Sequence, residues 1–147
     1  PEWWPLDHEA RRLQVDDIVR FVGQQDVPGS WYRVFDVFVT TSREDAFPLA
    51  ALEAATAGAP VVTFDTGGMV EFVTDRGAGV VVPYPDLPGF ADALAALADD
   101  EVRRASLGAA AAKGARAHHL TEVTAPRLAA FVADLAGEGD VPSRPCP

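Results

Sequence analysis

The sequence predicts an α/β fold with a doubly wound, mostly parallel sheet that is covered by helices on both faces. Short runs rich in β-branched residues alternate with helical stretches, and the runs are apolar on both faces, as buried parallel strands are. The composition also fits a globular protein, because 48% of the 147 residues are hydrophobic and 23% are charged. A chain of this length has room for one domain.

The order of expected elements supports this fold class. The expected strands share continuous β-branched or aromatic runs and cover residues 18–22, 37–40, 61–64 and 79–82. The expected helices, which include several at the C-terminal end, cover residues 7–14, 31–35, 48–57, 69–73, two stretches after 88, and 121–136. Residues 1–6 are expected to be an irregular lead-in. Residues 1–137 are expected to form a partial domain and residues 138–147 a flexible tail.

The charge balance and the single cysteine exclude several classes of function. Lys and Arg number 12 against 22 Asp and Glu, and this net charge of −10 disfavours nucleic acid and anionic membranes as partners. No apolar run reaches the roughly 20 residues that a membrane-spanning helix needs. Cys146 is the only cysteine, which fits a cytoplasmic location. Adjacent His118 and His119 face different directions on a helix, so we expect no metal site and no other cofactor.

The residues that follow the second expected strand are the most informative. Ligands of open parallel sheets bind beyond the carboxyl ends of the strands. Glu44 and Asp45 lie in this segment, and Pro48 opens the next helix, where its missing N–H costs nothing. The free N–H groups of Phe47 and Leu49 are therefore expected to point towards the strand ends, where they suit an anion or a hydroxyl group.

Glu53 is expected to be at least partly desolvated, because its helix lies among buried strands. A buried carboxylate is costly unless it is hydrogen-bonded, and vicinal sugar hydroxyls are suitable donors. Asp45 precedes it by roughly 12 Å along a helix axis, so two carboxylates could bind opposite ends of one extended ligand. A structural interpretation remains open: acids near a helix start commonly cap it, and Glu53 could pair with Arg43 or a backbone amide.

Residues 37–64 resemble the signature of family 4 (group 1) retaining glycosyltransferases, which have the GT-B fold. The matching residues are Thr41-Ser42, Asp45, Phe47, Leu49, Glu53-Ala54 and the run Gly58-Ala59-Pro60-Val61-Val62. Further matches occur at residues 19–23, 36–37, 66–71 and 79–83, so that the resemblance covers about residues 15–137. It implies the C-terminal, Rossmann-like, nucleotide-sugar-binding part of such an enzyme.

The resemblance also implies roles for individual residues. Glu53 corresponds to the acid that holds the ribose hydroxyls, and Asp45 to a catalytic acid that contacts the transferred sugar. The amides of Phe47 and Leu49 correspond to those that contact the sugar or the distal phosphate, and the segment after Gly23 to one that lies against the base. Gly67 and Gly68 allow either a close approach to the ligand or a plain turn.

Two departures from the family pattern concern the sugar. Asp45 stands where Glu is usual, while Glu44 is one residue too far from Glu53. Pro48 stands where Gly is frequent, which removes one amide donor.

The whole enzyme implied by the resemblance transfers a hexose from a nucleoside-diphosphate sugar to an unknown acceptor with retention and without a metal. The family places further strands, a basic pair and the acceptor-binding domain before residue 1, so we expect the sheet to be N-terminally truncated and this chain alone to be inactive. Two alternatives are a non-catalytic module that binds a nucleotide or a partner and a fragment of a GT-B-type sugar-nucleotide epimerase.

Overall fold

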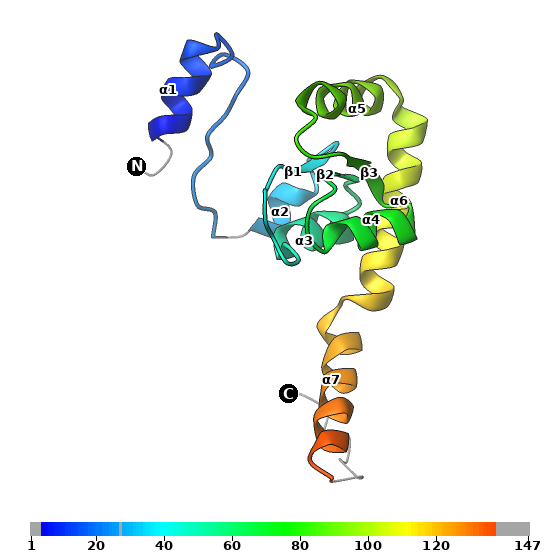
Figure 1. Cartoon of the computed structure of the whole chain (residues 1–147). Coiled ribbons are helices and arrows are strands. Elements are labelled where there is room, and N and C mark those ends of the chain that lie inside the picture. Colours follow the sequence, from blue (N-terminus) through cyan, green and yellow to red (C-terminus); the bar gives the residue numbers. More distant parts are fainter. Residues whose placement is uncertain (1–3, 27, 138–147) are drawn as a thin grey trace.

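A three-stranded parallel sheet in the order β1-β2-β3 forms the centre of the molecule (Figure 1). The computed structural model describes residues 4–26 and 28–137. Strand β1 covers Phe38–Thr40, β2 covers Val61–Phe64 and β3 covers Gly79–Val82. Val61 lies opposite Phe38 on one side and Gly79 on the other. The two later strands have the bounds that the sequence predicts.

Helices surround this sheet and extend beyond it. Their bounds are α1 Trp4–Arg12, α2 Pro28–Tyr32, α3 Leu49–Ala57, α4 Met69–Arg76, α5 Leu87–Asp99, α6 Glu101–His118 and α7 Thr121–Leu135. Sequence signals explain several ends: Gly58 adopts a left-handed φ of 101° after α3, and the Asp86 and Asp100 side chains cap α5 and α6. The predicted helix 48–57 is confirmed, and α4 is longer than predicted.

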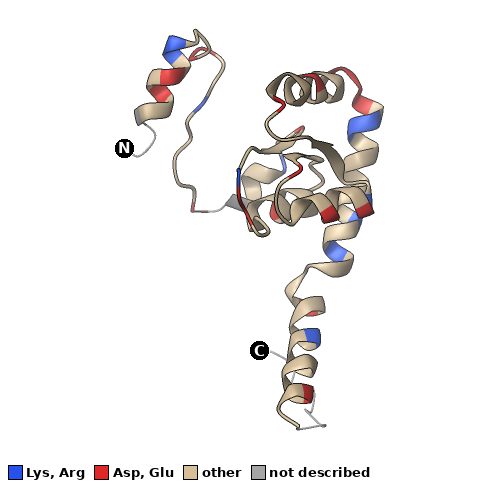
Figure 2. Cartoon of the chain, in the orientation of Figure 1, with Lys and Arg blue, Asp and Glu red and all other residues tan. Residues whose placement is uncertain are grey.

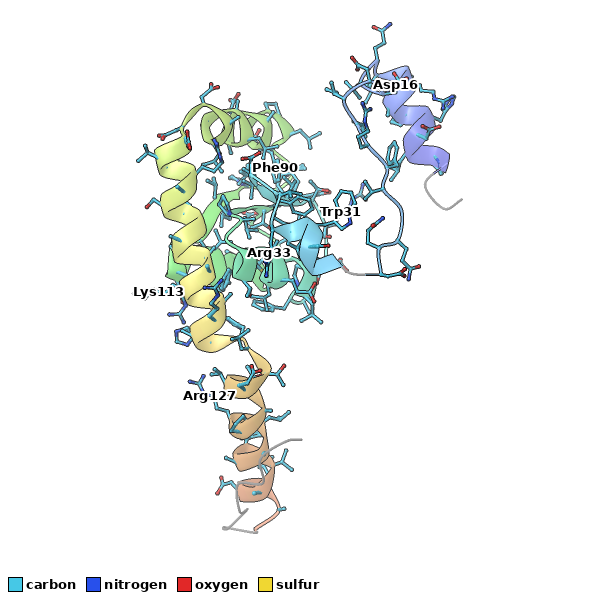
Figure 3. All side chains as sticks on the ribbon, turned by 180° about the vertical axis from the view of Figure 1, so that it is seen from behind. Asp16, Trp31, Arg33, Phe90, Lys113 and Arg127 are labelled. Atoms are coloured by element: carbon cyan, nitrogen blue, oxygen red, sulfur yellow. The ribbon has the colours of Figure 1, made fainter. Side chains whose placement is uncertain are left out.

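The central strand β2 is buried on both faces because its side chains alternate between two apolar clusters. Val61 faces a cluster built from α3, α4 and α6, which contains Leu52 and Phe72. Val62 and Phe64 face a second cluster that is built mainly from α5. Phe90, which belongs to this second cluster, points from α5 towards the sheet (Figure 3). The sheet is therefore covered on both sides, as the predicted fold class requires.

Helix α6 packs closely on α3 because Gly108 has no side chain. A Cβ at position 108 would collide with the carbonyl oxygen of Gly58, at the end of α3. Arg116, two turns further along α6, donates a hydrogen bond to the Thr56 carbonyl at 2.8 Å. This bond satisfies a carbonyl in the last turn of α3, which has no N–H donor within its own helix.

The strand predicted over residues 18–22 is wrong. These residues have no regular structure, and Ile18 is 74% exposed. In Figure 1 the segment between α1 and α2 runs apart from the sheet. A strand needs a neighbour for its backbone hydrogen bonds, and among the described residues β1 pairs only with β2. The segment has β-forming residues without a partner.

Predictions for the first two helices need correction, and the predicted tail is not described. Helix α1 begins at Trp4, so the lead-in predicted over 1–6 is wrong from residue 4 onwards, and the helix ends at Arg12 and not at residue 14. Helix α2 occupies 28–32 and not 31–35. Trp31 donates its ring N–H to the Gln25 side-chain oxygen at 2.8 Å and so holds the preceding segment (Figure 3). The predicted tail 138–147, with Cys146, lies outside the described residues.

Helix α7 projects away from the sheet in both views (Figures 1 and 3). It has no buried residue among those described, and Leu128, Phe131 and Leu135 are each more than 60% exposed. The predicted helix is confirmed, but the apolar face on which the prediction rests is not covered. In the described ranges 4–26 and 28–137, no helix is long and apolar enough to cross a bilayer.

Replacing Leu97 by Ala should lower the free energy of unfolding by about 2–5 kcal/mol, because the substitution leaves a cavity between α5 and the sheet. Leu97 is 0% exposed in the cluster with Phe64 and Phe90. Urea unfolding followed by circular dichroism measures the loss. Leu135→Ala is the matched control, since Leu135 is 71% exposed and should change stability by less than about 0.5 kcal/mol. Equal effects of the two substitutions would contradict this packing.

Candidate functional site

A small pocket lies at the carboxyl ends of β1 and β2, where the fold class places ligands. One wall is residues 41–48, which we call the site loop. The lining side chains are mostly oxygen-bearing, and they are Thr40, Ser42, Asp45, Thr63 and Thr66, with Pro48 and Met69 as apolar members. The cavity has room for about one water-sized group, so its oxygen lining suits a single hydroxyl of a larger ligand.

Asp45 is half-buried and bonded to its own loop. Its Oδ1 accepts a hydrogen bond from the Phe47 backbone N–H at 3.1 Å. A short Asp side chain readily reaches the amide two residues further on and stabilises a turn in this way. The prediction that the Phe47 N–H is free is therefore wrong. Asp45 therefore stabilises a turn before α3 and does not cap the helix, which the structural interpretation had allowed.

The start of α3 lies beside this turn. Pro48 precedes the helix with extended backbone angles and makes no side-chain cap bond. Leu49 is the first helical residue, so its N–H has no acceptor within the helix. The Leu49 side chain is 71% exposed, and only its backbone is suited to a ligand. The role expected of this amide stays a prediction.

Gly67 and Gly68 make room for the site loop. Gly67 has a left-handed φ of +71°, and a Cβ there would collide with the Asp45 carbonyl oxygen. A Cβ on Gly68 would collide with the Ala46 carbonyl oxygen, which already accepts the Gly68 N–H at 2.8 Å. The pair therefore forms a turn against protein backbone. Whether its backbone also contacts a ligand stays a prediction.

Thr66 adds a bond between the same two segments. Its hydroxyl donates to the Ser42 carbonyl at 3.0 Å. Thr66 belongs to the matched run 66–71 but is not among the predicted site residues. It lies two residues after the end of β2, where a hydroxyl can reach the neighbouring loop.

Glu53 is exposed, and the prediction that it is partly desolvated is wrong. Helix α3 buries Ala51, Leu52, Ala54 and Ala55 and turns the other face outward. Glu53 falls on that outer face, four residues after exposed Leu49. Its side chain does not line the pocket that contains Asp45. Helical periodicity explains this result, because the helix buries one face and not its whole circumference.

The Glu53 carboxylate interacts with Tyr32 from α2. Burial of the phenol, then a hydrogen bond with Glu53 and then the negative charge of Glu53 raise the pKa of Tyr32. The Tyr32 ring packs edge-on against Phe35 at 5.8 Å between ring centroids. No ion pair to Glu53 occurs within the described residues, so the suggested pairing with Arg43 is not formed there. Nothing in the local sequence indicates this contact between Tyr32 and Glu53.

His119 contacts the site loop through Phe47. Its ring lies against Phe47 at 5.3 Å between centroids, and it meets Phe72 of α4 edge-on at 5.4 Å. Burial is the main cause that lowers the pKa of His119, and the charges of His118 and Arg76 lower it further. Nothing local in the sequence indicates this contact, because Phe47 and His119 are far apart along the chain.

The site loop carries charges of both signs, on Arg43, Glu44 and Asp45. Figure 2 shows further Lys and Arg segments along α6. Within residues 4–26 and 28–137, no group of three or more His, Cys, Asp or Glu is arranged to hold a metal ion.

The sequence matches a known family over most of this region. The family described as "Glycosyl transferases group 1" matches residues 4–100. The chain is 42% identical to the D-inositol 3-phosphate glycosyltransferase of Kribbella flavida over 83% of its own length. It is 37% identical, over 74% of its length, to the lipopolysaccharide core biosynthesis mannosyltransferase LpsB of Rhizobium meliloti. The chain belongs to the group 1 glycosyltransferase family.

A solved structure shares the fold. Sucrose-phosphate synthase from Thermosynechococcus elongatus superposes with a TM-score of 0.86 at 26% identity, and the match covers 92% of this chain and 35% of that one. The predicted fold class, a Rossmann-like half of a GT-B fold, is confirmed by this likeness. The chain also covers only 29% and 31% of the two curated relatives, so it spans about a third of the length of its relatives.

Replacing Gly67 by Ala should destabilise the chain more than replacing Gly77 by Ala. Both glycines have a left-handed φ, +71° and +61°, which costs an Ala about 1–2 kcal/mol. A Cβ at Gly77 meets nothing within 4 Å, whereas a Cβ at Gly67 meets Asp45 backbone. The difference in unfolding free energy, measured in urea, should be at least about 1 kcal/mol. Equal losses would mean that the site loop does not pack on this turn.

Proposed function

We propose that this chain is the C-terminal, nucleotide-sugar-binding part of a family 4 retaining glycosyltransferase. In this proposal the whole protein transfers a hexose from a nucleoside-diphosphate sugar to an acceptor. The observation that carries the proposal is the oxygen-lined pocket at the ends of β1 and β2, with Asp45 in its wall. Membership of the group 1 family and the ordered matches from residue 19 to 83 support it.

Asp45 is the proposed catalytic acid of this site. Its Oδ1 is engaged by the Phe47 amide, which leaves the carboxylate oriented by its own loop at the pocket wall. In the proposed role the carboxylate accepts hydrogen bonds from hydroxyls of the transferred sugar. Such bonds to a charged group contribute about 1.5–3 kcal/mol each. The side chain is one methylene shorter than the Glu that is usual in the family, so the sugar has to lie closer to the loop.

Glu53 is the proposed ligand of the nucleotide's ribose. The carboxylate is exposed and interacts with Tyr32, so a ribose diol has to replace water and compete with the phenol for it. The exchange makes the binding weaker than it would be for a dry carboxylate. Phe47, Leu49, Gly67 and Gly68 complete the proposed binding site through their backbone.

Charge on the leaving diphosphate would be stabilised electrostatically. The amide at the start of α3, at Leu49, is the donor that this chain offers. We propose no metal and no cofactor other than the donor substrate. In the same proposal, cationic groups for the diphosphate and an N-terminal acceptor-binding domain come from parts of the protein outside residues 1–147, and the enzyme is cytoplasmic.

A second candidate function is nucleotide or partner binding without catalysis. Two observations favour it: Glu53 is exposed, and Asp45 uses one oxygen on its own backbone. The two candidates differ in what the acids do, so substitutions of the acids distinguish them.

Glu53→Ala should weaken nucleoside-diphosphate binding about three- to tenfold, because the ribose loses an acceptor that is solvated in the free chain. Uridine, guanosine and adenosine diphosphates are titrated into the chain by calorimetry. Asp45→Ala should leave that affinity nearly unchanged but weaken binding of the corresponding sugar nucleotide by a similar factor. Glu44→Ala is the matched control, an exposed acid beside Asp45. If none of the three nucleotides binds, or if all three substitutions act alike, the proposed roles are wrong.

The 147-residue chain by itself should show no transferase turnover, because the acceptor wall and the phosphate cations of the proposal are not in it. The assay measures release of nucleoside diphosphate from uridine-diphosphate glucose and guanosine-diphosphate mannose in the presence of D-inositol 3-phosphate. Robust turnover by the purified chain would refute the proposed division of the enzyme.

A further inference from the structure

His119 joins three parts of the molecule. It is the residue directly after α6, and Leu120 separates it from the start of α7. Its backbone N–H donates to the Ala115 carbonyl at 2.9 Å. Its ring lies between Phe47 of the site loop and Phe72 of α4, at centroid distances of 5.3 and 5.4 Å. The ring therefore lies between the loop that carries Asp45 and helix α4.

Three contacts with described residues hold the site loop, in addition to the packing of Phe47 on Gly68 and on the core cluster of α3, α4 and α6. The Thr66 hydroxyl binds the Ser42 carbonyl, and the Gly68 N–H binds the Ala46 carbonyl. The third point is the contact of Phe47 with His119. The two hydrogen bonds involve groups that do not titrate near neutral pH, whereas the imidazole does. Of these three attachments, only the ring contact changes with a proton.

The surroundings of the ring favour its uncharged form. Burial opposes a charge there, and His118 on the same helix and Arg76 on α4 add positive potential, while Glu71 on α4 opposes them. The site loop presents the uncharged Phe47 ring. These causes together lower the pKa of His119 below its ordinary value of about 6.5. The packing is consequently retained above pH 6.5 and is lost as the pH falls through the lowered value.

We propose that His119 is a positioning residue for the site loop, whose neutral ring holds Phe47 in place and whose protonation releases it. His119 does not line the pocket, so it acts through Phe47 and not on a ligand. The turn made by Asp45 and Phe47 shares this support, because the Phe47 amide is the group that the Asp45 carboxylate binds. The effect on ligand binding rests on the proposed function, but the effect on the loop does not.

The first test follows the loop without any ligand. Amide and histidine-ring NMR signals of the 147-residue chain are recorded from pH 8 to 5. We expect signals of residues 42–47 to change together with the His119 ring signal, with a midpoint below pH 6.5. His119→Phe keeps a flat ring that cannot be protonated, and it should abolish this change. His8→Phe is the control on exposed α1 and should preserve it. Loop signals that ignore the His119 titration in the unsubstituted chain would overturn the proposal without any variant.

The second test measures affinity for whichever of the three nucleoside diphosphates binds. Loss of an aromatic contact corresponds to about a three- to tenfold weakening, which we expect between pH 7.5 and 5 in the unsubstituted chain and not in His119→Phe. A pH-dependent loop in a chain that binds no nucleotide would contradict the proposed function alone. Nucleotide binding with loop signals that do not respond to the His119 titration would overturn the positioning role alone.

Discussion

The site depends on a close approach between two backbone segments. Carbonyl oxygens of Asp45 and Ala46 occupy the space where side chains of Gly67 and Gly68 would otherwise lie. Two loops that follow neighbouring parallel strands are thereby held in backbone contact, with Thr66 and Gly68 bonded across them. A pocket at the strand ends results, and Asp45 lies in its wall because backbone contacts and two hydrogen bonds hold its loop on the turn.

Exposure of Glu53 limits the free energy that a contact with a ribose diol could contribute. A carboxylate that water already solvates gains little from a ribose diol beyond the exchange of one hydrogen-bond partner for another. Tyr32 interacts with this carboxylate, and burial of the phenol followed by its hydrogen bond with Glu53 raises the pKa of Tyr32. In the proposed function, a nucleotide would therefore derive its affinity from several modest contacts along the site loop and the start of α3. The two curated relatives are about three times longer than the region that this chain matches.

Some elements can be predicted from the sequence and others cannot, and the reasons are physical. Strands β2 and β3 and helix α3 were predictable because both faces or one whole face are buried, and burial selects the residue pattern. Residues 18–22 have an equally strong strand pattern, but they lack a neighbour with which to form hydrogen bonds. The same limit applies to α7, whose apolar residues predict a helix without indicating what covers it. Asp45 in the pocket was predictable from its place after a strand, whereas the exposure of Glu53 was not.

The sequence alone determined the α/β class, the order of elements, the position of the site loop and the family, because these depend on local patterns and an ordered set of motifs. Only the tertiary structure decided that the Phe47 amide binds Asp45, that Glu53 meets Tyr32 and that His119 packs on Phe47. Each of these contacts depends on a side-chain direction or on residues distant in the chain. Periodicity and spacing along a sequence describe which face a residue shares, but not which atom it reaches.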